Sequence, residues 1–177
     1  MKGSIQLSAL VLLFVAGLRA QQEKPAIVAG DGGFQERGSA RVLYWGPRIN
    51  AAHGEFAIDY GRPVWKKAYD DPANFDKMTK GKVWRLGSNF WTTLDTNLPL
   101  TVSGRQVGIG SYYLGLRRAA DGNTWSLAFI DPVKARAMHL DAFQIERAPI
   151  LFEAPMEVEK ASGTVEKLTM TLSYTKE

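Results

Sequence analysis

The sequence predicts an all-β, mainly antiparallel domain, folded as a β-sandwich with one or two short covering helices. A closed β-barrel is the alternative. Three observations carry this prediction. Apolar and polar side chains alternate along several segments, glycine-containing turn sequences separate these segments, and only two short segments begin with helix-capping signals.

Four segments show the two-residue period of a strand with one buried face. In each of them an apolar side chain recurs at every second position. These apolar sets are Phe56, Ile58 and Tyr60; Tyr112, Leu114 and Leu116; Trp125, Leu127 and Phe129; and Leu168, Met170, Leu172 and Tyr174.

Turn sequences predict three hairpins, at Ser103-Gly104, Asp121-Gly122-Asn123 and Ser162-Gly163. Glycine readily adopts the positive φ that tight hairpin turns require. Three hairpins in one small chain favour an antiparallel sheet over a parallel one. Asp71-Pro72 and Asp131-Pro132 each resemble an N-cap followed by proline at the first helical position, so a short helix is expected after each.

The first 20 residues are predicted to form a cleavable signal peptide, followed by a flexible leader over residues 21–40 and a single domain over residues 41–177. Lys2 precedes an apolar run centred on residues 10–16, and the small residue Ala20 ends the segment. The run is too short for a bilayer span, which needs about 20 residues. We therefore expect an exported protein, periplasmic or extracellular, with no transmembrane segment after cleavage.

Composition excludes several kinds of site. The chain has no cysteine, which rules out disulfides and thiolate metal sites, and its two histidines, His53 and His139, lack a metal-ligand spacing. Cleavage after residue 20 removes two of the 22 basic residues, which leaves 20 against 18 acidic ones and no basic cluster. We expect no nucleic-acid partner, no metal and no cofactor, and we assign no catalytic residue.

Carboxylates are the basis of one alternative hypothesis, a carboxylate-dependent hydrolase. Asp70, Asp71 and Asp76 cluster where the first helix is expected, but helix capping explains Asp71 without a metal. The sequence does not show which two acids would face each other across a cleft.

Arginines and aromatic residues are concentrated between residues 60 and 91. Guanidinium groups bind anions bidentately, and tryptophan offers a flat face to sugar rings or apolar ligands. We expect Arg62 and Arg85 to hold an anionic or hydroxyl-bearing group of a small ligand or cell-envelope glycan, with Asn89 orienting it. Trp84 or Trp91 would stack on the ligand. In the competing interpretation the tryptophans are core, the arginines fix loop backbone, and the protein is a purely structural or interaction module.

The same segment carries a family pattern. Residues 60–63 (YGRP), 82–89 (KVWRLGSN) and 92–93 (TT) follow a pattern of Y-x-R-P and then G-K-V-W-R-x-G-A-N-E-A-T-T. With further similar stretches, the likeness covers about residues 52–174, and the sequence resembles the bacterial domain of unknown function 2911 family. The resemblance implies an exported β-rich protein without an agreed biochemical activity. Phe90 stands where the pattern has glutamate and Trp91 where a small residue is usual, which favours an apolar or aromatic contact site over an enzyme.

Overall fold

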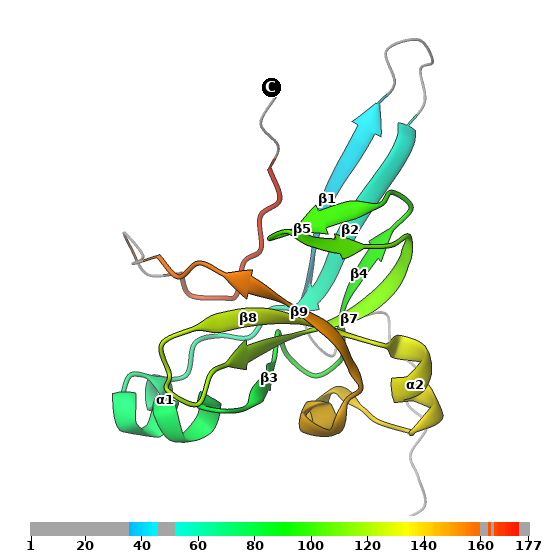
Figure 1. Ribbon diagram of the computed structural model, residues 1–177. Helices are drawn as coiled ribbons and strands as arrows, with labels where there is room; N and C mark the ends of the chain where they lie inside the picture. Colours follow the sequence, from blue (N-terminus) through cyan, green and yellow to red (C-terminus); the bar gives the residue numbers. More distant parts are fainter. Residues whose placement is uncertain (1–35, 46–51, 160–162, 164, 174–177) are drawn as a thin grey trace, which may run out of the picture.

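The computed structural model describes residues 36–45, 52–159, 163 and 165–173 of the 177-residue chain. Antiparallel strands dominate these residues, and the helices are short (Figure 1). In chain order the elements are β1 (Arg37–Trp45), β2 (Ala52–Gly61), the 3-10 helix η1 (Lys67–Tyr69), α1 (Pro72–Thr79), β3 (Val83–Arg85), β4 (Thr92–Thr96), β5 (Leu100–Val102), β6 (Arg105–Val107), β7 (Gly110–Arg118), β8 (Trp125–Ile130), α2 (Pro132–Ala137), the 3-10 helix η2 (Ala142–Arg147) and β9 (Ile150–Met156).

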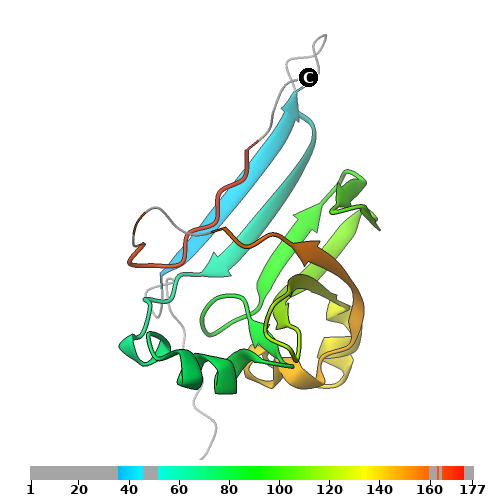
Figure 2. The same ribbon diagram turned by 60° about the vertical axis from the view of Figure 1, so that its left-hand side comes forward.

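Seven strands form one sheet in the order β1-β2-β4-β7-β8-β9, with β3 also paired to β7. β4 pairs with residues 110–114 of β7 and β3 pairs with residues 115–117, so β3 and β4 lie end to end along one edge of β7. β5 and β6 form a separate hairpin, and β1 and β2 project beyond the rest of the sheet (Figure 2). The sheets do not close on themselves. The arrangement therefore fits the predicted sandwich rather than the barrel alternative.

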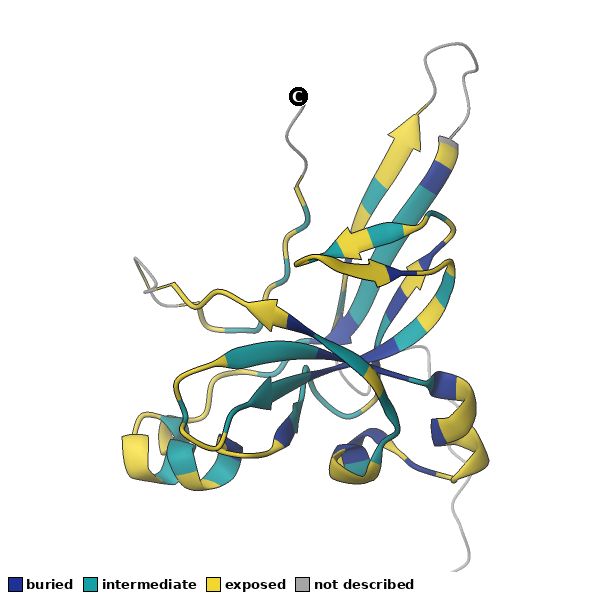
Figure 3. Ribbon diagram, viewed as in Figure 1, coloured by how far each residue is buried: buried dark blue, intermediate teal, exposed yellow. Residues whose placement is uncertain are grey.

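Side chains on both faces of the central strands are buried, as the alternation along β8 shows. Phe129 belongs to one core cluster, whereas Ala128 and Ile130 belong to another on the opposite face. The second cluster is completed by Ala135 of α2 and Ile145 of η2. Two of the short helical segments thus cover one face of the sheet, and the buried positions gather where the strands cross (Figure 3).

Both predicted helices form, and each begins directly after its predicted N-cap. The Asp71 carboxylate accepts a hydrogen bond from the N–H of Ala73 at 3.0 Å, and the Asp131 carboxylate accepts bonds from the N–H groups of Val133 and Lys134 at 2.9 and 3.0 Å. A proline follows each cap, where its missing N–H costs no helical hydrogen bond.

Two of the three predicted hairpin turns are confirmed. Ser103 and Gly104 join β5 to β6 with positive φ values of 47° and 77°, and Gly122, with φ of 81°, lies in the turn between β7 and β8. Ser162 of the third turn lies outside the described residues, and the described residues after Gly163 contain no strand.

Residues 168–174 were predicted to form a half-buried strand. The predicted alternation of burial is confirmed over residues 168–173, but the prediction of a hydrogen-bonded strand is wrong. Leu168, Met170 and Leu172 are half-buried, whereas the residues between them are exposed. Residues 168–173 nevertheless join no strand ladder, and Tyr174 lies outside the described residues. The side chains of Tyr60 and Arg62, together with one backbone hydrogen bond from Leu168 to Pro63, hold this segment, so the alternation of burial persists without a β-ladder.

The folded region begins before the predicted boundary at residue 41. Residues 37–40, which we expected in the leader, are the first four residues of β1 and pair with β2 from Arg37 opposite Gly61 to Ala40 opposite Ile58. Ala40 is buried by this pairing. The predicted signal peptide and residues 21–35 lie outside the described residues, so they stay predictions. Among the helices that the structure describes, none has the length and apolar character needed to cross a membrane.

Candidate functional site

A cavity of about 960 Å³ lies between the end of β2, strand β3 with the loop that follows it, and the C-terminal segment. We call residues 165–170 the C-terminal strap, because most of them form one wall of this cavity. Four of the five predicted site residues line it, namely Arg62, Trp84, Arg85 and Asn89. The fifth, Trp91, does not.

The loop between β3 and β4 brings these residues together. β3 and β4 share one edge of β7, so residues 86–91 must leave the sheet and return to it. Gly87 and Asn89 have positive φ values of 119° and 59°, and the Thr92 hydroxyl donates a hydrogen bond to the Leu86 carbonyl across the base of the loop. A side chain at Gly61 would collide with Ser88, so glycine lets β2 approach the loop closely. The loop thereby lies beside Arg62.

Trp91 belongs to the core and not to the cavity. Its ring stacks on Tyr113 with the centroids 4.6 Å apart and the planes 2° from parallel, and it packs against the helix-covered core cluster. The preceding Phe90 is 64% exposed and does not line the cavity either. The structure therefore does not bring Trp91 together with the other predicted ligand-binding residues. As β4 begins, its register turns residue 91 toward the helices.

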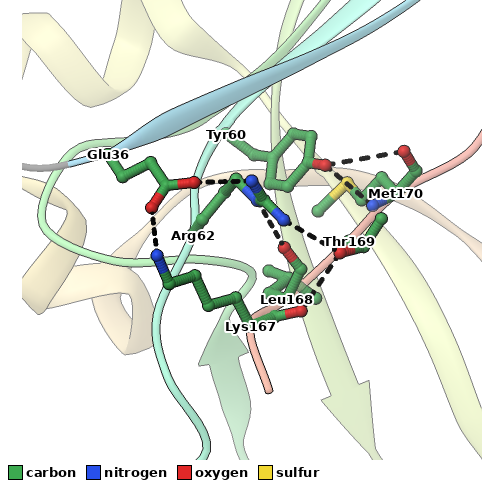
Figure 4. A network of polar contacts seen from close by, with 7 residues as sticks. All are labelled: Glu36, Tyr60, Arg62, Lys167, Leu168, Thr169 and Met170. Atoms are coloured by element: carbon green, nitrogen blue, oxygen red, sulfur yellow. Dashed lines mark hydrogen bonds and ion pairs between the residues drawn. The ribbon is translucent and has the colours of Figure 1, made fainter. Parts of the chain in front are cut away.

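Each nitrogen of the Arg62 guanidinium donates one hydrogen bond within the protein (Figure 4). Its Nε donates to the Leu168 carbonyl at 3.2 Å, Nη1 to Glu36 Oε1 at 2.5 Å, and Nη2 to Thr169 Oγ1 at 3.2 Å. Lys167 pairs with the other oxygen of Glu36. Arg62 thus holds the strap in place. This is the role that the competing interpretation assigned to the arginines, namely fixing loop backbone.

Tyr60 anchors the strap one step further along. Its hydroxyl accepts a hydrogen bond from the Met170 N–H at 2.8 Å and donates to the Met170 carbonyl at 3.5 Å (Figure 4). The Leu168 N–H donates to the Pro63 carbonyl at 3.0 Å. The hydrogen bond from Lys167, with the charges of Lys167 and Arg62, lowers the pKa of Glu36 below its ordinary value of 4.5.

Arg85 has the opposite surroundings. Its guanidinium carbon lies 3.9 Å from the centroid of the Phe143 ring, and its Nη1 is buried with no hydrogen-bond partner among the described residues. The Asp141 carboxylate instead caps η2 by accepting from the Phe143 N–H at 2.8 Å. Burial lowers the pKa of Arg85, while the nearby Tyr69 and Asp141 act in the other direction.

Aromatic side chains form the wall beside Arg85. Trp65 meets Tyr69 edge to face at 5.2 Å between centroids, and Tyr69 meets Trp84 in the same way at 5.6 Å. Phe75 of α1 packs edge to face against Trp84 at 5.8 Å. Trp65 remains 50% exposed, and its Nε1 donates to Asp70 at 2.7 Å. These contacts fix the orientation of the rings that face the cavity.

The carboxylates near α1 have structural partners. Asp70 accepts from Trp65, Asp71 caps α1, and Asp76 pairs with Lys80 and Arg118. Within the part of the chain that the structure describes, no group of three or more histidine, cysteine, aspartate or glutamate residues is placed to hold a metal.

Sequence reasoning missed several residues of this site, which are Glu36, Trp65, Tyr69, Phe143 and the strap. The alternation over residues 168–172 was the signal for the strap, but we assigned it to a sheet. Nothing local marks Phe143, since η2 brings it to Arg85 from 58 positions further along the chain.

Comparison with known proteins identifies the family. No curated protein and no solved structure matches the chain. A family model described as "Protein of unknown function (DUF2911)" matches residues 48–177, which is well over half of the chain. That match includes every cavity residue except Glu36. As its motifs predicted, the chain belongs to the DUF2911 family.

Proposed function

We propose that this protein is an exported binding module that holds a small ligand or a segment of cell-envelope glycan in the cavity between the C-terminal strap and the β3–β4 loop. Its export, to the periplasm or beyond, rests on the amino-terminal sequence pattern. The binding role is supported above all by one observation: Arg85 lines the cavity, and its buried Nη1 has no hydrogen-bond partner among the described residues.

A buried guanidinium nitrogen without a partner is costly, because it has given up its hydrogen bonds to water and gained none in return. A purely structural role would place a carboxylate or carbonyl beside it, as the protein does for Arg62. The Asp141 carboxylate, whose charge acts on Arg85, caps a helix instead. A bound ligand with an acceptor oxygen would supply the missing partner once the groups that cover Nη1 shift to admit it.

A thermal-shift screen of the purified protein tests this proposal, with envelope glycans, small anions, lipids and divalent cations as the panel. A ligand at 100 times its dissociation constant adds about 2.7 kcal/mol to the free energy of unfolding. For a domain of this size, such a gain raises Tm by several degrees. We expect the shift to disappear in Arg85→Met and to persist in Arg105→Met, which alters an exposed arginine that does not line the cavity.

Two results would count against the proposal. A panel without any shift would favour the purely structural module. A shift of equal size in Arg85→Met would move the ligand to another surface.

A further inference from the structure

The ligand's charge is indicated by the balance of ionisable groups around the cavity. Four basic and two acidic side chains line it, an excess of two positive charges. One of the acids, Glu36, is already paired with Arg62 and Lys167. The basic lining residues are Arg62, Lys66, Arg85 and Lys167, and the acidic ones are Glu36 and Glu166. This balance favours an anion and disfavours a divalent cation.

The acceptor group is indicated by the geometry at Arg85. The Phe143 ring lies against the guanidinium, so a partner must approach from the directions that this ring leaves free. A guanidinium presents its N–H groups as a planar fork, and that fork matches the two oxygens of a carboxylate. A neutral hydroxyl would hydrogen-bond to the guanidinium but would leave its charge uncompensated.

The body of the ligand is indicated by the aromatic wall. Trp65, Tyr69 and Trp84 form a continuous edge-to-face series along the cavity. Trp65 remains half exposed, and Phe143 is 68% exposed. Rings in fixed orientations bury a flat apolar ligand at little cost in conformational entropy, whereas an inorganic anion would leave this surface in water.

We propose that the ligand is an organic carboxylate with an aromatic or alicyclic ring. Its carboxylate accepts from the Arg85 guanidinium, and its ring packs against Trp84 and Tyr69. This inference rests on the proposed function, because it specifies the ligand class of the same cavity.

Isothermal titration calorimetry with three probes tests the inference on the purified protein. The probes are 2-naphthoate, the neutral 2-naphthamide of nearly the same shape, and inorganic phosphate. We expect 2-naphthoate to bind at least about tenfold more tightly than 2-naphthamide, because a charge-assisted pair is lost in the amide. We also expect it to bind more tightly than phosphate, which has no ring to bury.

Variants locate the effect. Arg85→Met should reduce 2-naphthoate affinity to that of 2-naphthamide, and Trp91→Phe should leave both affinities unchanged, because Trp91 is a core residue. Equal binding of naphthoate and naphthamide, or phosphate binding without naphthoate binding, would overturn the ligand class and leave the binding function standing. If neither naphthalene probe binds while a neutral glycan raises Tm, the class is likewise wrong. Absence of binding by every probe and by the whole screening panel would overturn both proposals.

Discussion

Arg62 and Arg85 lie on the same cavity, yet the protein treats their guanidinium groups in opposite ways. Every nitrogen of Arg62 has an acceptor, supplied by Glu36 and by the strap. Nη1 of Arg85 has none among the described residues, although Asp141 lies close enough to influence its pKa. One wall is therefore a polar network, and the other holds a partly buried guanidinium with one buried nitrogen that lacks a described partner.

Within one site, Arg62 therefore contributes to the stability of the fold, and Arg85 is left to contribute to binding. A satisfied network stabilises the fold and has little left to offer a ligand. A buried polar group without a partner lowers the free energy of unfolding, and this loss is recovered only when a bound ligand supplies the partner. A substitution at Arg62 should therefore lower the stability of the fold, whereas a substitution at Arg85 should mainly weaken ligand binding.

The largest effect is expected from replacing Arg62. Arg62→Met keeps much of the apolar stem but removes the donors to Leu168, Glu36 and Thr169. We expect the free energy of unfolding to fall by about 2 kcal/mol, mostly from the orphaned Leu168 carbonyl, since a partly exposed ion pair contributes little. At that size Tm would fall by about 4–8 °C in a thermal melt.

Arg85→Met is the matched control for that measurement. It removes no hydrogen bond from Nη1 to any described residue, so its free energy of unfolding should stay within about 1 kcal/mol of the unaltered protein's. The contact with Phe143 accounts for that loss. If Arg85→Met lowered the free energy of unfolding as much as Arg62→Met does, the two arginines would not differ, and both would have a structural role.

A smaller effect is expected at the far anchor of the strap. Tyr60→Phe removes the hydroxyl that bonds to both backbone groups of Met170, while the ring stays in the core. The expected loss is about 1 kcal/mol of unfolding free energy, measured by urea denaturation. Protection of the Met170 amide from hydrogen exchange should fall as well. Unchanged protection would mean that the hydroxyl does not hold the strap.

The smallest effect concerns pH, because Glu36 is exposed. Its pKa in the folded protein is lowered, so its pairing with Lys167 and Arg62 stabilises the fold above the ordinary value of 4.5. This contribution is lost as the pH falls through the lowered value. We therefore expect Glu36→Gln to melt earlier than the unaltered protein at pH 7.

At low pH, where Glu36 of the unaltered protein is protonated and as neutral as the glutamine of the variant, the two melting temperatures should converge. Comparison with Glu36→Gln isolates this carboxylate from Asp76, whose pKa is lowered in the same direction by hydrogen bonds from Lys80 and Arg118. A difference in Tm that persists unchanged at low pH would show that the charge of Glu36 is not what stabilises the strap.

Local signals in the sequence were sufficient for much of the fold. The N-caps Asp71 and Asp131 and the Ser103-Gly104 turn formed as predicted, because each depends on backbone geometry within a few residues. The alternation along β2, β7 and β8 predicted strands for a similar reason. Over residues 168–172 the alternation predicted the burial correctly, but within the described residues this segment pairs with no strand, and only an isolated bridge between Val64 and Lys167 lies next to it.

By itself, the sequence determined the antiparallel β class, the short capped helices, the family, and the gathering of Arg62, Trp84, Arg85 and Asn89. Only the tertiary structure decided what each of these residues does. The partner of Arg62 lies 106 positions away at Leu168, and the register of β4 turns Trp91 inward while its neighbour Phe90 stays in solvent. Such pairings depend on which distant segments meet, and residue type and local spacing do not encode that meeting.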